Sequence, residues 1–261
     1  MSGPLFVIGG HEDREGDRLI LQAVADARHR GPVALVTAPS RKPEQYLPMY
    51  VDAFRPLGAE VVEVRLEDRA AADDPSRLGV LDDAGVIFIS GGNQVRGSET
   101  LRGSLAAGRM RERWQDGIPV AGTSAGASLI AEVMLGGGSN AESPDPGELE
   151  IVHGLALLRG VLVDQHFAER GRLPRMLAAA ALCRMVGLGV DEDTAAVVRD
   201  DVMEVIGSGT VTIADPARAT GRRESGGISI RGLEVDVVVP GDDPFDLAAL
   251  LPAEGSTDAD A

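Results

Sequence analysis

The sequence contains very little cysteine and no long apolar segment, and each shortage excludes a class of protein. Cys183 is the single cysteine among 261 residues, which excludes an internal disulfide framework and a cysteine-based zinc site. Its apolar neighbours are typical of a small, buried hydrophobic residue. No apolar run approaches the roughly 18 residues of a membrane-spanning helix, and the N-terminus lacks the features of a signal peptide. We therefore expect a cytoplasmic protein without a membrane partner.

Aromatic and basic residues are also scarce. Phe, Tyr and Trp make up 3% of the chain, which is too few for a surface on which nucleic-acid bases stack. Lys and Arg number 25 against 41 Asp and Glu, so the net charge is −16. Because binding to a phosphate backbone needs clustered Lys and Arg, we expect no nucleic-acid partner.

The first half of the chain alternates short apolar runs with longer amphipathic segments. The apolar runs predict buried strands at Leu5–Ile8, Val33–Val36, Val61–Val64, Val86–Ile89 and Pro119–Ala121. The segments between them predict helices over Glu15–Arg30, Pro43–Leu57 and Ser98–Gln115. This alternation is typical of an α/β fold in which helices cover both faces of a mostly parallel sheet, as a sandwich of three layers. In such sheets the active site lies beyond the carboxyl ends of the strands.

The second half is less regular. A strand is predicted at Val161–Val163 and a helix over Arg175–Met185. Short strands, expected to add in antiparallel fashion, are predicted near Val197 and at Val202–Ile206, Val211–Ile213 and Val235–Val239. No linker separates the halves, so we expect one domain over residues 1–252. Residues 253–261 are small and acidic and predict a disordered tail.

The segment around Ser124 has the pattern of a nucleophile elbow. An apolar strand leads into Gly122-Thr123-Ser124-Ala125-Gly126, which matches G-x-S-x-G, and a helix follows. A sharp turn from strand to helix presents the serine hydroxyl only when its neighbours are small. The backbone N–H of Ala125 can then help to stabilise an oxyanion. The alternative is a serine that merely caps the helix.

A serine nucleophile needs a general base, and the sequence has four histidines. His29 lies at a polar helix end, and His153 has no reactive side chain beside it in the sequence. His11, in a loop at a strand end, stays a candidate. His166 follows a predicted strand within an Asp-Gln-His triplet, at the edge of the sheet where active sites form. Taken alone, His166 fits a catalytic role and a structural role equally.

Three arginines follow His166 in an otherwise acidic protein. Arg170, Arg172 and Arg175 surround the predicted start of a helix. Cations at that end oppose the helix dipole and one another, so they bring no evident stability. Together with exposed helix N–H groups they could bind a carboxylate of a substrate. The alternative is a solvated basic face that pairs with surface acids.

These segments resemble cyanophycinase, a family of serine exopeptidases related to aspartyl dipeptidase. GTSAGA at 122–127 and DQHFAERGRLPRM at 164–176 carry the resemblance. Further segments agree in the same order, namely IGGHED at 8–13, ISGGNQ at 89–94, GGGS at 136–139 and GVDEDTA at 189–195. Asn93, where the family often has Asp, and His11 are departures near the expected pocket. The resemblance implies a class I glutamine amidotransferase-like α/β sandwich rather than an α/β-hydrolase, whose triad follows the order Ser, acid, His.

Carried over position by position, the resemblance implies a Ser-His-Glu triad. Ser124 would be the nucleophile and His166 the general base. Glu192 would be the acid, which holds the imidazole tautomer, and Glu142 is a second candidate for that role. The oxyanion hole would be formed by the backbone N–H groups of Gly92 and Ala125. The residues expected to line the substrate pocket are Gln94, Asp164, Gln165, Arg170, Arg172 and Arg175.

The resemblance also implies a substrate. Cyanophycin has a polyaspartate backbone with arginine joined to each side-chain carboxyl, and the family releases β-Asp-Arg dipeptides from it. Pocket arginines could hold free carboxylates, and Asp164 could hold a guanidinium. Two alternatives stay open: the same machinery acting on short aspartyl or isoaspartyl peptides, and a non-catalytic binding protein. We expect no metal or cofactor, since the histidines are scattered, and we expect a homodimer from the family alone.

Overall fold

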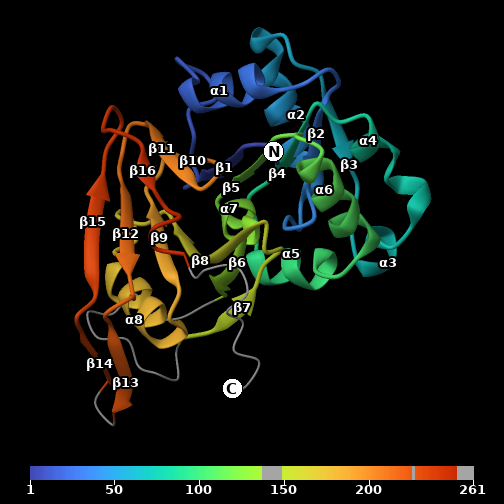
Figure 1. Cartoon of the computed structure of the whole chain (residues 1–261). Coiled ribbons are helices and arrows are strands. Elements are labelled where there is room, and N and C mark those ends of the chain that lie inside the picture. The colour runs from blue at the N-terminus through green and yellow to red at the C-terminus, as the bar shows by residue number, and fades with distance from the viewer. Residues whose placement is uncertain (137–148, 225–226, 252–261) are drawn as a thin grey trace.

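Two β-sheets organise the part of the chain that the computed structural model describes, residues 1–136, 149–224 and 227–251 (Figure 1). The first sheet consists, in order, of β16 (Phe245–Asp246), β11 (Val202–Gly207), β10 (Thr194–Arg199), β1 (Leu5–Ile8), β5 (Val120–Thr123), β4 (Val86–Ile89), β2 (Val33–Val36) and β3 (Val61–Val64). The second consists, in order, of β15 (Glu234–Val238), β12 (Val211–Asp215), β9 (Val186–Val190), β8 (Leu158–Gln165), β6 (Ala131–Leu135) and β7 (Ile151–His153). A separate hairpin joins β13 (Thr220–Glu224) to β14 (Gly227–Arg231).

Neighbouring strands of the first sheet run parallel in the order β1, β5, β4, β2 and β3. Helices cover both faces of this part of the sheet. One face buries Phe6 and Ile8 together with residues of α1 (Leu19–Ala27) and α2 (Pro43–Phe54). The other face buries Leu5 and Val7 together with residues of α5 (Gln94–Leu101), α6 (Leu105–Gln115) and α7 (Ala125–Ile130). The short helices α3 (Arg69–Ala72) and α4 (Gly79–Asp82) lie beside α5 and α6. The mixed α/β fold predicted from the sequence is therefore confirmed.

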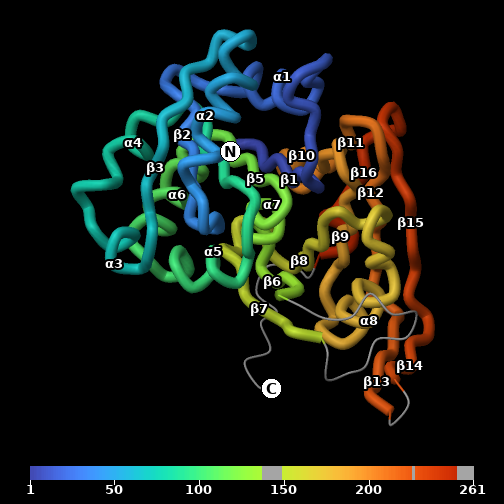
Figure 2. Tube along the Cα trace, turned by 180° about the vertical axis from the view of Figure 1, so that it is seen from behind, coloured from blue at the N-terminus to red at the C-terminus, as the bar shows by residue number. Residues whose placement is uncertain are grey.

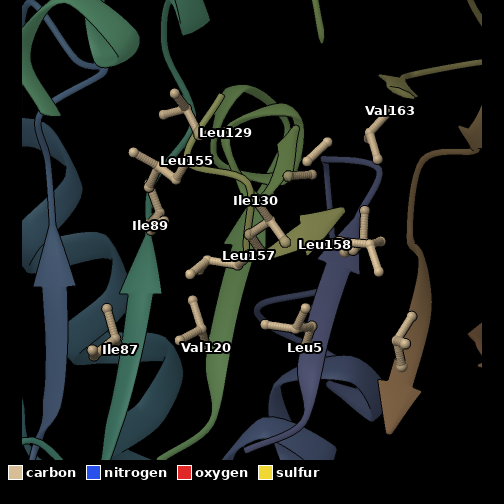
Figure 3. Packing of buried hydrophobic residues seen from close by; sticks show 14 of the residues in the cluster. Leu5, Ile87, Ile89, Val120, Leu129, Ile130, Leu155, Leu157, Leu158 and Val163 are labelled. Atoms are coloured by element: carbon tan, nitrogen blue, oxygen red, sulfur yellow. The ribbon is translucent and has the colours of Figure 1, made fainter. Parts of the chain in front are cut away.

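Helix α7 lies between the two sheets and joins them directly. Each of its residues is buried, and Leu129 and Ile130 belong to one apolar cluster with Ile89, Val120 and Leu158 (Figure 3). The chain enters α7 from β5 of the first sheet and leaves it into β6 of the second sheet without a loop. The carboxyl end of β5 therefore lies at the junction of the two sheets.

The short strands predicted as antiparallel in the second half do pair antiparallel. In the first sheet β10 pairs antiparallel with β1 and β11 pairs antiparallel with β10, and in the second sheet β12 pairs antiparallel with β15. β6, β8 and β9 instead run parallel to one another and build the second sheet. Helix α8 (Leu173–Cys183) packs on that sheet, and the β13–β14 hairpin packs on α8, on the side of the molecule away from α3 and α4 (Figure 2). The pairing of β6, β8 and β9 into a parallel second sheet was not predicted from the sequence.

Two predicted helices differ from the observed ones. The first begins at Leu19 rather than at Glu15, because Asp13 accepts hydrogen bonds from backbone N–H groups of residues 15, 16 and 18 and holds them in a loop. The predicted helix over Ser98–Gln115 is divided into α5 and α6. Between them Gly103 takes a left-handed backbone with φ +73°, which ends the first helix.

Some predictions concern residues outside the described ranges. Glu142, the second candidate for the triad acid, and the tail at 253–261 both lie there. The single domain over residues 1–252 also stays a prediction. Within the described ranges, no helix has the length and apolar character to span a membrane.

Candidate active site

Ser124 lies at the turn between β5 and α7. Its backbone adopts φ +53° and ψ −113°, values that a residue with a side chain rarely takes and that often mark a functional turn. A Cβ on Gly122 would overlap the carbonyl of Gly126, so close packing requires the small residues of the motif. The Ser124 hydroxyl makes no capping hydrogen bond to α7. This observation favours the nucleophile elbow over the helix cap.

Ser124, His166 and Glu192 form a chain of two hydrogen bonds. Nε2 of His166 lies 2.8 Å from Oγ of Ser124, and Nδ1 lies 2.6 Å from Oε1 of Glu192. With a proton on Nδ1 donated to the carboxylate, Nε2 is free to accept the serine proton. The His166 side chain is 4% exposed and that of Glu192 is 25% exposed. The arrangement is that of a nucleophile, a base and an orienting acid.

Backbone hydrogen bonds hold the loops that carry His166 and Glu192. The N–H of His166 donates to the carbonyl of Gly9 at 2.9 Å, and the N–H of Asp193 donates to the carbonyl of Gly10 at 2.8 Å. A Cβ on Gly10 would overlap the imidazole of His166. The loop after β1 therefore supports both His166 and Glu192, the candidates for base and acid.

The pKa values of His166 and Glu192 favour the states that catalysis needs. Burial lowers the pKa of His166 below 6.5, the hydrogen bond to Glu192 opposes that shift, and the charge of Arg170 adds to it. Partial burial raises the pKa of Glu192, but hydrogen bonds from His11 and His166 outweigh this and bring the pKa below its ordinary value. At neutral pH the imidazole is therefore neutral and the carboxylate ionised, as a general base and its orienting acid require.

The backbone N–H groups of Gly92 and Ala125 are available to meet an oxyanion. Within the described residues neither donates a hydrogen bond. β4 and β5 pair in parallel with Ile89 beside Gly122, so the loop that follows β4 and the elbow that follows β5 lie at the same edge of the sheet. Gly91, the neighbour of Gly92, lies beside Ser124, since a Cβ on Gly91 would be 3.5 Å from the Cβ of Ser124; the oxyanion hole stays a prediction.

Asp164, Arg172 and Arg175 form a buried ion cluster. Nε and Nη2 of Arg175 donate to Asp164 at 2.7 and 2.6 Å, and Nη1 of Arg172 donates at 2.9 Å. Burial lowers the pKa of Arg172 to about 10, with Asp164 opposing the shift and the charge of Arg175 adding to it. The sequence analysis expected these arginines to meet a substrate carboxylate or surface acids. In the structure both arginines pair with the buried carboxylate of Asp164 rather than with surface acids, and their contact with a substrate stays a prediction.

Two polar atoms beside this cluster have no partner among the described residues. They are Oε1 of Gln165 and Nε of Arg172, both in side chains that are nearly inaccessible to solvent. A buried polar group without a hydrogen bond costs about 1–3 kcal/mol. Gln165 precedes His166 directly, so these atoms are candidates for contact with a substrate. Arg170, by contrast, is exposed and acts on His166 through its charge.

Gln94 and Asn93 have structural partners at the start of α5. Nε2 of Gln94 donates to the carbonyl of Leu135 at 2.8 Å, which ties α5 to the end of β6. The Asn93 side chain accepts a hydrogen bond from the backbone N–H of Arg96 at 2.9 Å and caps α5. Asp caps a helix in the same way, so Asn93 is a conservative departure from the family pattern.

Sequence analysis missed two residues near the site. The Glu12 side chain is 1% exposed and accepts hydrogen bonds from the Tyr50 hydroxyl at 2.7 Å and the Thr123 hydroxyl at 2.5 Å. It thereby anchors the residue before Ser124, and its place at a strand end was a usable signal. The second residue is Tyr46. A Cβ placed on Gly91 would lie 3.5 Å from the Tyr46 hydroxyl and 3.5 Å from the Cβ of Ser124, so Tyr46 and Ser124 both lie beside Gly91. No sequence pattern distinguishes Tyr46 from other helical residues.

The remaining histidines divide into two groups. His29 and His153 are exposed and are not part of the triad cluster. His11 joins that cluster, since its Nδ1 lies 2.8 Å from Oε2 of Glu192. Among the described residues, His11, His166 and Glu192 are also the group with donor atoms close enough, within 4.8 Å, to hold a metal ion. Their mutual hydrogen bonds already use these atoms.

Comparison with known proteins gives a consistent result. The model of peptidase family S51 matches residues 5–206. The cyanophycinase of Synechococcus elongatus is 37% identical over 221 residues, which cover 82% of this chain and 68% of that protein. The cyanophycinase of Geminocystis herdmanii is 36% identical over 221 residues, covering 81% of this chain and 80% of that protein. The crystal structure of a peptidase from an acI-B1 Actinobacterium has the same fold, with a TM-score of 0.71 and 21% identity over 94% of this chain and 97% of that one.

Proposed function

The chain belongs to peptidase family S51 and is a serine-type peptidase, and from this premise we propose that it cleaves the polyaspartate backbone of cyanophycin and releases β-Asp-Arg dipeptides. The observation that carries the proposal is the chain of hydrogen bonds from Ser124 through His166 to Glu192. Relatives that are named cyanophycinase and are 36% and 37% identical to this chain over 221 aligned residues support the choice of substrate.

In the proposed mechanism the Ser124 hydroxyl attacks the carbonyl carbon of the scissile amide while His166 accepts its proton. The backbone N–H groups of Gly92 and Ala125 stabilise the oxyanion of the tetrahedral intermediate. Glu192 holds the imidazolium, which then gives its proton to the leaving amine, and an acyl-enzyme forms on Ser124. His166 next takes a proton from a water molecule whose oxygen attacks the acyl carbon, and it returns that proton to Oγ of Ser124 as the acyl group leaves as a carboxylic acid.

The substrate chemistry fits the polar groups next to the triad. Gln165, which directly precedes His166, and Arg172 each keep a buried polar atom without a partner among the described residues, and these atoms suit an amide and a carboxylate of the substrate. Arg170 offers an exposed positive charge for a free carboxylate. Asp164 and Arg175 hold one another, and we assign them to the wall behind these groups rather than to direct contact.

The deciding experiment is product analysis on insoluble cyanophycin. The proposal predicts β-Asp-Arg as the product for the wild-type protein and none for Ser124→Ala. Assays with Asp-X dipeptides and isoaspartyl dipeptides run in parallel. Activity on those peptides alone would make the chain an aspartyl dipeptidase, and ligand binding without hydrolysis would make it a binding protein.

Three further expectations belong to this proposal. The fold is assigned to the class I glutamine amidotransferase-like sandwiches, with Ser124 at the elbow. The protein is proposed to act in the cytoplasm as a homodimer. Sedimentation of the purified protein and fractionation of its host cells test the last two points.

A further inference from the structure

The carboxylate of Glu192 lies between two imidazoles. Oε1 faces Nδ1 of His166 at 2.6 Å, and Oε2 faces Nδ1 of His11 at 2.8 Å. The two rings meet edge to face, with centroids 5.0 Å apart. His11 is 66% exposed, whereas His166 is 4% exposed. The outer imidazole is therefore reached by solvent, and the inner one is shielded from it.

The position of His11 is set by its backbone. Its φ of +49° lies in the left-handed region, which is unfavourable for a histidine and persists only where neighbouring contacts hold it. Such contacts flank it on both sides. The carbonyl of Gly10 accepts from the N–H of Asp193 at 2.8 Å, and the N–H of Asp13 donates to the Asp193 carboxylate at 2.8 Å. The His11 loop is thus fastened to the loop of Glu192.

A second imidazole on the acid has two physical consequences. Glu192 is one-quarter exposed, so without His11 its outer oxygen would be solvated and the carboxylate freer to turn away from His166. A protonated His11 would also add a positive charge that lowers the pKa of His166, as the charge of Arg170 does. Besides Arg170, the charged groups beside this loop include Asp193, which accepts the N–H of Asp13, and Glu169, whose carboxylate accepts the backbone N–H of Glu192 at 3.2 Å.

We propose that His11 is a positioning residue of the triad, which holds the outer oxygen of Glu192 so that the inner oxygen stays aligned with His166. The proposal rests on the proposed function and extends its Ser-His-Glu triad to a fourth side chain. It concerns the reactivity of Ser124, whichever substrate the enzyme takes.

Two variants separate the hydrogen bond of His11 from its charge. His11→Gly removes the side chain and accepts the left-handed backbone without strain. His11→Asn keeps an N–H donor near the place of Nδ1, tolerates that backbone, and never carries a charge. His29→Asn, at an exposed histidine outside the site, is the matched control. The readouts are the rate at which a fluorophosphonate probe labels Ser124 and the NMR titration of the His166 ring.

We expect His11→Gly to label about tenfold more slowly, the loss typical of one hydrogen bond to a charged group. His11→Asn should stay within about threefold of wild type, since an amide N–H replaces the donor. Both variants lack the positive charge of His11, so the pKa of His166 should be higher in both variants than in the wild type. The His29→Asn control should match the wild type in both readouts.

The proposal is overturned if the probe labels Ser124 in His11→Gly at the wild-type rate. Equal slowing of His11→Gly and His11→Asn, with equally lowered thermal unfolding temperatures, also overturns it, because that pattern indicates a structural role of the loop. Neither readout uses cyanophycin. A protein that labels at Ser124 but leaves cyanophycin intact would refute the proposed substrate and leave the test of His11 valid.

Discussion

Nε2 of His166 lies 2.8 Å from Oγ of Ser124, although the two residues are 42 positions apart and extend from different sheets. Ser124 follows β5 of the first sheet, and His166 follows β8 of the second. The loop after β1, which carries Gly9 and Gly10, holds the two ends together. The candidate active site is therefore assembled at the junction of the sheets, and this predicts how several variants will behave.

Replacing Ser124 with alanine should abolish hydrolysis and leave the fold unchanged. The hydroxyl has His166 as its partner and makes no capping bond, so its loss removes the nucleophile without leaving an unmet structural group. We expect activity to fall at least about a thousandfold, as for other serine nucleophiles. Product assays measure the activity, and circular dichroism during thermal unfolding measures the fold. Full activity in this variant would exclude Ser124 as the nucleophile.

The pH dependence of Ser124 reactivity should report His166. The base works when neutral, so reactivity is lost as pH falls through its pKa. Because burial and the charge of Arg170 hold that pKa below 6.5, the acid limb should have its midpoint below pH 6.5. Arg170→Gln removes a charge that lowers the pKa, so the midpoint should move to higher pH.

The control for this prediction is Arg30→Gln, which removes an exposed charge on a different part of the chain. Probe labelling of Ser124 across pH measures both variants without the substrate. The difference between Arg170→Gln and wild type should shrink at high salt, since exposed charges are screened. An acid limb that is unchanged by Arg170→Gln would contradict the electrostatic account.

Asp164→Asn should destabilise the protein strongly. Asp164 neutralises two buried guanidinium groups, and removing one partner of a buried ion pair costs about 3–5 kcal/mol. Asp52→Asn is the matched control, because Asp52 pairs with Arg55 at 2.8 Å where both side chains are 70% exposed. That change should cost less than about 1 kcal/mol. Urea unfolding gives both free energies, and similar values for the two variants would argue against a structural role for the Asp164 cluster.

Gly10→Ala should impair catalysis. Its φ is +107°, and a Cβ would overlap the ring of His166, so the imidazole must move away from Ser124. We expect a loss of at least about tenfold in kcat, because small displacements of catalytic groups are costly. Gly108→Ala is the opposite case, since nothing lies within 4 Å of a Cβ there and the site is inside α6. That variant should keep full activity and gain about 0.5–1 kcal/mol in stability.

Several features were predictable because one local rule decides each of them. The strands β1, β2, β3 and β4 have the predicted bounds, since a short apolar run between Gly, Pro or polar residues is typical of a buried strand. The elbow at Ser124 was predictable because small residues at fixed spacing allow a tight turn. The position of His166 directly after a strand was predictable from the apolar run that precedes it, and β8 ends at Gln165.

Other features depend on contacts between distant segments. β6 follows α7 without a loop, so one largely apolar segment, which Ser128 and Glu132 interrupt, contains both elements and no change of periodicity separates them. The interpretation of Arg172 and Arg175 as substrate ligands missed their pairing with Asp164, because the strand-to-helix connection that brings the three together has no sequence signature. The pairing of His11 with Glu192 joins residues from opposite ends of the matched family region and was not predictable.

The direct passage from β5 through α7 into β6 has a consequence for how inhibitors act. A reagent attached to Ser124 that also contacts His166 would bridge the two sheets as a crosslink does. Covalent inhibition should therefore slow hydrogen exchange in strands of both sheets, far beyond the residues that the reagent touches.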